Sequence, residues 1–304
     1  MIRNINKYNI LKWYKMLTGK SILHVNQGVG KIYSKNEIKG YYNDLTEKVL
    51  KDDELYSVKI PNLKTVEGED IIFPVAVFQY GLGAYDLYLL ENKELYFNKF
   101  KLMAEWALYN QEESGAWNNF FYVYPRNPYS AMAQGEGASL LIRAYIEFDD
   151  ERYLNAARKA IEFMLISIEY GGTTLYKDDS VLFKEYTHKP MVLNGWIFAL
   201  FGLYDYVKIS DDEHAKEVLN RSIQSIKLNL ALFDNGFWSM YNTDGMITSP
   251  FYHDLHIAQL SVLYDLFNIK EFKEYTYKWK KYRNKWFNSK LAFIVKVTQK
   301  ITEK

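Results

Sequence analysis

The feature of this sequence that most limits its fold is a repeat of about 60 residues. Four apolar segments each end in a polar break, after which a second helical pattern begins. Their marker tyrosines, Tyr85, Tyr145, Tyr204 and Tyr264, fall 60, 59 and 60 residues apart, and three of the four are followed by aspartate. This spacing indicates that one structural unit is used four times.

Each unit contains two helices of different character. The first is apolar on nearly all sides, as in WIFALFGLYDYV, which is typical of a helix buried among others. The second is amphipathic: in EHAKEVLNRSIQSIKLNL the apolar residues recur at three- and four-residue intervals. An inner and an outer helix, four times over, predict a mainly α fold, an incomplete α/α toroid of about four helix pairs. An open solenoid of helix pairs is the alternative.

The connections between these helices are unequal in length. Turns from inner to outer helix are short and acidic, whereas the returns, at residues 112–129, 168–192 and 232–253, are long and contain glycines among aromatic residues. Long loops in a compact domain are usually functional, and this composition predicts small β-hairpins. The topology puts all three returns at one end of the ring, beside the N-termini of the inner helices, where an anion is favoured.

The chain divides into three parts on this interpretation. Residues 1–70 are an irregular segment that packs on the toroid, residues 71–285 are the toroid, and residues 286–304 are a basic amphipathic tail. The tail suits a docked helix, an interfacial membrane segment or a partner contact, and we favour the docked helix over membrane contact.

Composition excludes several classes of function. The chain has no cysteine, so a disulfide framework, thiol catalysis and thiolate metal sites are ruled out. Its formal charge of +1 gives no global attraction to nucleic acid. Two histidines three residues apart, His253 and His256, supply too few ligands for a catalytic metal, and we expect no cofactor. We recognise no signal peptide or membrane span and expect a cytoplasmic protein.

The long returns concentrate aromatic rings, amides and isolated charges. Rings stack on sugar faces while polar side chains bind hydroxyls, so this mixture predicts a carbohydrate site, although aromatics that only fill the ring would give a similar composition. Paired carboxylates, Glu185 with Asp234 or Glu136, would suit a glycosidase.

Several segments carry a more specific signal, in the order FPVAVFQYGLGAYD, NPYSAMAQGEGASLLIRAY, KEYTHKPMVLNGWIFALFGLYD, MYNTDG and FYHDLHIAQL. Over about residues 70–285 the chain resembles the D-glucuronyl C5-epimerase family, which converts D-glucuronic to L-iduronic acid within heparosan-type polymers. The resemblance implies a toroid catalytic domain, no cofactor and a uronate-containing polysaccharide as substrate, and a homodimer is plausible on the resemblance alone. The chain departs from the animal enzymes in its short N-terminal region and in Asn242, Thr243 and Asp244, where those enzymes place an arginine.

Matched to the family's motifs, the catalytic residues are Glu185, Tyr186, Tyr241 and Tyr252. We expect Tyr252 to act on one face of C5 and Glu185, helped by Tyr186, on the other, with Tyr241 positioning the sugar. The predicted substrate-binding residues are Trp117, Asn118, Tyr129, Gln134, Arg143, Asn194, His253 and His256. A uronate lyase, a glycoside hydrolase and a non-catalytic carbohydrate-binding protein are the alternatives.

Overall fold

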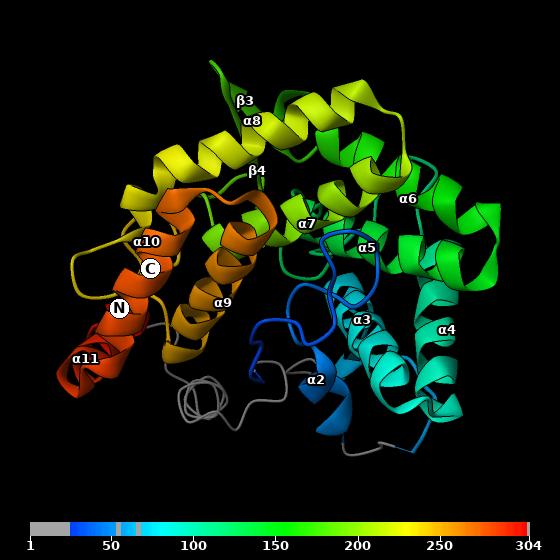
Figure 1. Cartoon of the computed structure of the whole chain (residues 1–304), viewed down its shortest axis with the longest axis horizontal. Helices are drawn as coiled ribbons and strands as arrows, with labels where there is room; N and C mark the ends of the chain where they lie inside the picture. Colours follow the sequence, from blue (N-terminus) through cyan, green and yellow to red (C-terminus); the bar gives the residue numbers. More distant parts are fainter. Residues whose placement is uncertain (1–24, 53–55, 65–67, 303–304) are drawn as a thin grey trace.

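The computed structural model describes residues 25–52, 56–64 and 68–302, and it is an incomplete ring of paired helices (Figure 1). The predicted mainly α toroid of four helix pairs is confirmed. The inner helices are α3 (Pro74–Glu91), α5 (Ala131–Phe148), α7 (Leu193–Ile209) and α9 (Pro250–Phe267). The outer helices are α4 (Glu94–Tyr109), α6 (Glu151–Leu165), α8 (Glu213–Asn229) and α10 (Lys270–Asn284).

The short turns from inner to outer helices have a local cause. Asn92, Asp149 and Asn268 follow their inner helices in the left-handed conformation, with φ of 52° or 53°, which ends a helix sharply. The side chains of Asp150 and Asp212 then accept a backbone N–H and start α6 and α8. The acidic residues predicted for these turns therefore serve as helix caps.

The inner helices α5 and α7 cross with their backbones in contact. A Cβ atom at Gly202 would collide with the backbone of Gly135, and one at Gly135 would lie 2.6 Å from the Cα of Ala199. Two glycines in apolar helices are therefore needed for the closest approach of two helices that frame the site.

We expect Gly202→Ala to lower the free energy of unfolding by about 2 to 3 kcal/mol, because the added methyl group must push α5 and α7 apart. Urea denaturation measures this loss. Gly28→Ala is the matched control, since its Cβ would have no atom within 4 Å. Equal midpoints for the two variants would contradict the close crossing.

The aspartates of the repeat hold residues 25–52, called the N-terminal segment below, across one end of the ring. Each lies near the C-terminal end of an inner helix and accepts a hydrogen bond from residues 33–42. The pairs are the Tyr33 hydroxyl with Asp265 at 2.9 Å, the Tyr41 N–H with Asp86 at 2.9 Å, and the Tyr42 hydroxyl with Asp205 at 2.6 Å. The segment thus closes the end of the ring that is opposite to the long returns.

The same segment continues into the gap between α9 and α3 (Figure 1). It forms the short helix α2 (Thr46–Leu50). The carbonyl oxygen of Leu45 lies so close to α3 that any side chain at Gly83 would collide with it. A strand pair, β1 (Leu63–Lys64) with β2 (Asp70–Ile71), precedes α3.

One of the three returns contains the expected hairpin, formed by β3 (Thr174–Lys177) and β4 (Ser180–Phe183). Residues 110–130 instead fold into successive turns, and the third return has isolated bridges such as Met240 with Ile247. In that return the side chains of Asp234 and Asn242 accept the backbone N–H two residues ahead. Such turns compete with a regular strand ladder, which explains the difference.

The helix α11 (Trp286–Thr302) packs on the third return. Ala292 contacts Trp238 and Ile247, and the Lys296 ammonium donates to the Ile247 carbonyl at 2.7 Å. Within the described part of the chain, no helix is both long enough and apolar enough to cross a membrane.

Candidate functional site

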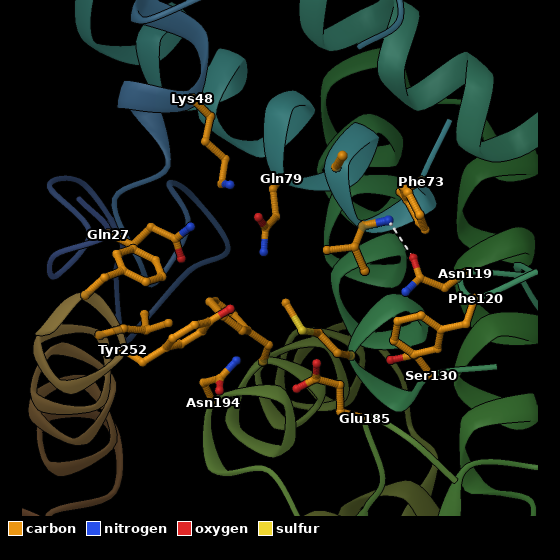
Figure 2. Close-up of a pocket in the computed structure, with 16 residues that line it drawn as sticks. Gln27, Lys48, Phe73, Gln79, Asn119, Phe120, Ser130, Glu185, Asn194 and Tyr252 are labelled. Atoms are coloured by element: carbon orange, nitrogen blue, oxygen red, sulfur yellow. Dashed lines mark hydrogen bonds between the residues drawn. The ribbon is translucent and has the colours of Figure 1, made fainter. Parts of the chain in front are cut away.

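A cavity of about 300 Å³ lies at the N-terminal ends of the inner helices (Figure 2). All four inner helices contribute to its wall, together with the first two long returns. Of the third return, as the sequence bounded it, only Phe251 and Tyr252 line the cavity, and both are part of α9. The polar residues of the lining are Gln27, Lys48, Gln79, Asn119, Ser130, Glu185, Asn194 and Tyr252, and apolar side chains such as Phe73, Phe120 and Phe198 separate them.

Glu185 is placed by the hairpin and by α7. It follows β4, whose end is tied to α5 because the Ala131 N–H donates to the Lys184 carbonyl at 2.9 Å. Its carboxylate lies against the first turn of α7, where a Cβ atom at Gly195 would collide with Oε2. Glycine at this position makes room for the acid beside a helix N-terminus.

Tyr186 and Tyr241 lie beside this carboxylate. The second and third returns are joined by backbone hydrogen bonds, from the Leu193 N–H to the Tyr241 carbonyl at 3.4 Å and from the Thr243 N–H to the Met191 carbonyl at 3.1 Å. The hydroxyls of both tyrosines lie close enough to Glu185 to lower the pKa of its carboxyl group. Two tyrosines that are 55 positions apart in the sequence therefore lie beside one acid.

Tyr252 completes the group from α9. The proline at the start of this helix places Tyr252 and His253 in its first turn rather than in a loop, and the Ser249 side chain accepts the Tyr252 N–H. The Tyr252 ring stands edge-on to that of Tyr241, with 5.2 Å between centroids. The four residues predicted to be catalytic thus lie close together, and two of them, Glu185 and Tyr252, line the cavity.

Burial controls the acidity of Glu185. Only 7% of the residue is exposed, and no group in the described residues bonds to Oε2. Burial raises its pKa to about 7, although the two phenols and the charge of Lys189 act in the opposite direction. An acid with this pKa is divided between both forms near neutral pH, as a general base must be.

The pKa values of the three phenols are raised, so the phenols keep their protons. Burial raises the pKa of Tyr186, Tyr241 and Tyr252 well above the ordinary value, and the charge of Glu185 raises each further. A phenol with a raised pKa stays protonated at neutral pH, so no phenolate is present to act as a base. The neutral hydroxyl still donates hydrogen bonds and can give its proton to a strong base such as a carbanion. The site therefore contains one candidate base among three donors.

A second buried acid, Glu136, lies beside the cavity on α5. The Gln79 amide donates to its Oε1 at 2.8 Å, and no described residue bonds to Oε2. Burial raises its pKa to about 8, the Gln79 bond and Lys48 oppose this, and the charge of Glu185 adds to it. The other acid considered for hydrolysis, Asp234, instead bonds to the Trp279 indole at 2.9 Å.

We expect Glu136 to make folding stability fall as pH rises. Its pKa is about 8 in the folded protein and 4.5 ordinarily, so between these values the folded state holds a proton that the unfolded state has released. From about pH 5 to about pH 8 the wild type should lose on the order of 2 to 4 kcal/mol more stability than Glu136→Gln. Urea denaturation at both pH values tests this, and equal losses would contradict it.

Arg143 does not reach the cavity. It lies 12 residues into α5, about 18 Å along the axis from the mouth. Its guanidinium bonds to Asp205 at 2.7 Å and to the carbonyls of Lys39 and Gly40 at 2.9 and 3.1 Å. The structure therefore places this predicted substrate-binding residue where it anchors the N-terminal segment.

The two predicted histidines belong to the core. His253 stacks on Trp238 with centroids 3.7 Å apart, accepts the Ser239 N–H at Nδ1 and contacts the Trp279 carbonyl through Nε2. His256 Nδ1 lies 3.2 Å from the Ser239 hydroxyl. Burial lowers both pKa values to about 3. Neutral histidines three residues apart thus tie the third return to α9 and α10. The described residues contain no cluster suited to a metal ion.

Two other predicted contacts are also structural. The Trp117 indole donates to the Ala107 carbonyl at 2.9 Å and packs on Phe78. The Tyr129 hydroxyl donates to Glu112 at 2.8 Å. Neither residue lines the cavity.

Of the three amide residues predicted to bind substrate, one lines the cavity. Asn194 lines the cavity, and its Oδ1 has no partner among the described residues. Gln134 is fully buried on α5, also without described partners for its amide. Asn118 is outside the lining, whereas its neighbour Asn119 is part of it and accepts the Val75 N–H at 3.1 Å.

The sequence prediction missed five polar residues of the lining: Gln27, Lys48, Gln79, Asn119 and Ser130. Gln79 could have been found, because an amide within the apolar inner helix of a repeat needs a partner or a cavity. Gln27 and Lys48 precede the repeat, so no pattern indicated that they reach the site.

Fold and cavity together place this chain among the α/α toroids that have a polar and aromatic cavity at the N-terminal ends of their inner helices. A family model described as the C-terminus of D-glucuronyl C5-epimerase matches residues 90–281. The chain belongs to this family, and the resemblance seen in the sequence is confirmed.

Individual relatives are similar over part of their length. The D-glucuronyl C5-epimerase of Caenorhabditis elegans is 30% identical over 201 residues, which are 57% of this chain and 33% of the relative. An uncharacterized protein of Methanocaldococcus jannaschii is 30% identical over 197 residues, 63% of this chain and 60% of that protein. The chain thus spans between a third and three fifths of these relatives.

A solved structure with a similar fold is an inactive variant of an α-1,6-mannanase from Salegentibacter sp. HEL1_6 in complex with α-1,6-mannotetrose. The TM-score is 0.52 at 14% identity, over 84% of this chain and 80% of the other. At this identity the similarity concerns the helical toroid alone.

Proposed function

We propose that this protein converts D-glucuronosyl to L-iduronosyl residues in a uronate polysaccharide of the heparosan type. The observation that carries the proposal is the buried Glu185 carboxyl, which has a pKa near neutrality, lies beside two phenols and lines the cavity that Tyr252 also lines. Membership of the epimerase family supports the same reaction.

The reaction removes the proton at C5, which lies next to the sugar carboxylate, and returns one from the opposite face. In the D-gluco to L-ido direction, Glu185 takes the C5 proton and becomes neutral. The electron pair of the C–H bond moves into the sugar carboxylate, and Tyr252 then gives its hydroxyl proton to C5 on the other face. A proton passes back from Glu185 to the Tyr252 phenolate through Tyr241 or solvent, which restores both groups.

The surroundings favour this charge movement. Negative charge grows on the carboxylate of the sugar, and preorganised donors stabilise such charge without rearranging. The N-termini of the inner helices point to the cavity and supply partial positive charge. The hydroxyls of Tyr186 and Tyr241 lie beside Glu185 and favour its ionised form, because both lower its pKa.

Analysis of the products after incubation with heparosan tests the proposal. Iduronate in a polymer of unchanged length supports it. Ultraviolet absorbance from an unsaturated uronate, with shorter chains, would instead identify a lyase, because elimination shares the first proton abstraction. Shorter chains without that absorbance would indicate a hydrolase. An unchanged polymer across several uronate polysaccharides would leave a binding protein.

A further inference from the structure

Part of the cavity wall lies outside the region that the family model matches. Glu185, Asn194 and Tyr252 fall within residues 90–281, whereas Gln27 and Lys48 come from the segment ahead of α3. Figure 2 shows Lys48 and Gln27 on the side of the cavity away from Glu185. The N-terminal segment therefore contributes chemistry to the site as well as filling the ring.

A uronate brings one negative charge into this cavity, and a buried charge needs a partner. Of the described residues in the lining, Lys48 alone has a cationic side chain. Lys189 is close to the site but lies over the rings of Tyr124 and Tyr186, 4.0 and 5.1 Å from their centroids. Arg143 is bonded to Asp205 at the other end of the ring.

Contacts of the helix α2 fix the position of Lys48. Its helix, α2, is held against α3 by the contact between Leu45 and Gly83, and it begins where Asp44 accepts the Thr46 N–H at 3.0 Å. This packing directs the Lys48 side chain into the cavity from the wall opposite to the base (Figure 2).

The electrostatic surroundings of Lys48 suit a transient anion. Its neighbouring acid, Glu136, has a pKa raised to about 8 by burial and is largely protonated at neutral pH. Burial lowers the pKa of Lys48 to about 8, and an entering carboxylate raises it again. Binding of a uronate therefore stabilises the ammonium ion.

We propose that Lys48 binds the carboxylate of the sugar in the cavity and makes the site select uronates over neutral hexoses. The inference rests on the proposed function for the choice of sugar, but it concerns binding and can be tested without turnover. The N-terminal segment is then a specificity element of the site.

Calorimetry with a heparosan tetrasaccharide and its carboxyl-reduced counterpart tests the inference. We expect the wild type to bind the uronate form more tightly by about 10- to 100-fold, the usual size of a charge-assisted hydrogen bond. Lys48→Gln should lose this preference while binding the reduced sugar as before, and Lys48→Arg should retain most of it. Lys51→Gln is the matched control, because Lys51 directly follows the same helix and pairs with Glu47 at 2.6 Å.

Epimer formation measured in parallel separates the two proposals. If Lys48→Gln keeps the wild-type preference, or if the wild type has none, the inference is wrong even when iduronate forms. If the preference depends on Lys48 and no iduronate forms, the proposed function is wrong and uronate recognition by Lys48 stands. Thermal unfolding of Lys48→Gln shows whether a loss of binding comes from loss of fold.

Discussion

Glu185→Gln should reduce iduronate formation by about 10³- to 10⁴-fold, the upper range for loss of a general base. Glutamine keeps the shape beside Gly195 and can still accept hydrogen bonds from Tyr186 and Tyr241, so the change removes the proton acceptor and little else. Chromatographic or NMR analysis of the disaccharides measures the effect. Glu169→Gln, an exposed acid in the same return, is the control.

Stability gives an independent check on this variant. The pKa of Glu185 is about 7 in the folded protein and 4.5 ordinarily, so its ionisation above pH 7 opposes folding. Glu185→Gln should therefore be as stable as the wild type or more so at about pH 8, by on the order of 1 to 3 kcal/mol. Loss of activity together with a large loss of stability would contradict this account of the site.

Tyr252→Phe should separate the two halves of the reaction. Glu185 remains able to remove the C5 proton of glucuronate and return one to the same face, but the donor on the opposite face is gone. We expect iduronate formation to fall by about 10²- to 10³-fold while deuterium from the solvent still enters C5 of glucuronate.

The NMR spectrum of a polymer incubated in D₂O reports both events in one sample. Tyr264→Phe, a marker tyrosine near the other end of α9, is the matched control and should retain both. An equal loss of exchange and epimer formation in Tyr252→Phe would mean that Tyr252 acts in the abstraction step, and the assignment of the two faces would have to be reversed.

The ring and the meeting of its loops were predictable because both follow from the repeat. A 60-residue period of buried and amphipathic helices leaves few arrangements other than a toroid, and the returns of a toroid share one end. Glu185, Tyr241 and Tyr252 could therefore be placed near one another from the sequence.

The interior polar residues were harder to interpret. Arg143, His253 and His256 carry side chains that suit a sugar site, yet each is buried with partners that come from distant parts of the chain. A single sequence does not tell a polar residue that faces a cavity from one that is satisfied in the core, because the difference depends on which segment packs against it.

Lys48 is the opposite case, a cavity residue that the sequence did not indicate. It lies on a helix of one and a half turns, in a segment without a repeat, and its place at the cavity depends on the tertiary contact of Leu45 with Gly83. The local sequence carries no information about the cavity wall that this helix forms.

The most direct test of the central claim is the pH dependence of solvent deuterium entry at C5 of a heparosan-type polymer, catalysed by the wild-type protein. Glu185 acts as a base only when it is ionised, so the exchange rate should rise with pH and level off above an apparent pKa near 7. Exchange that does not change between about pH 5 and about pH 8, or no exchange at any pH, would contradict Glu185 as the base of a C5 epimerase.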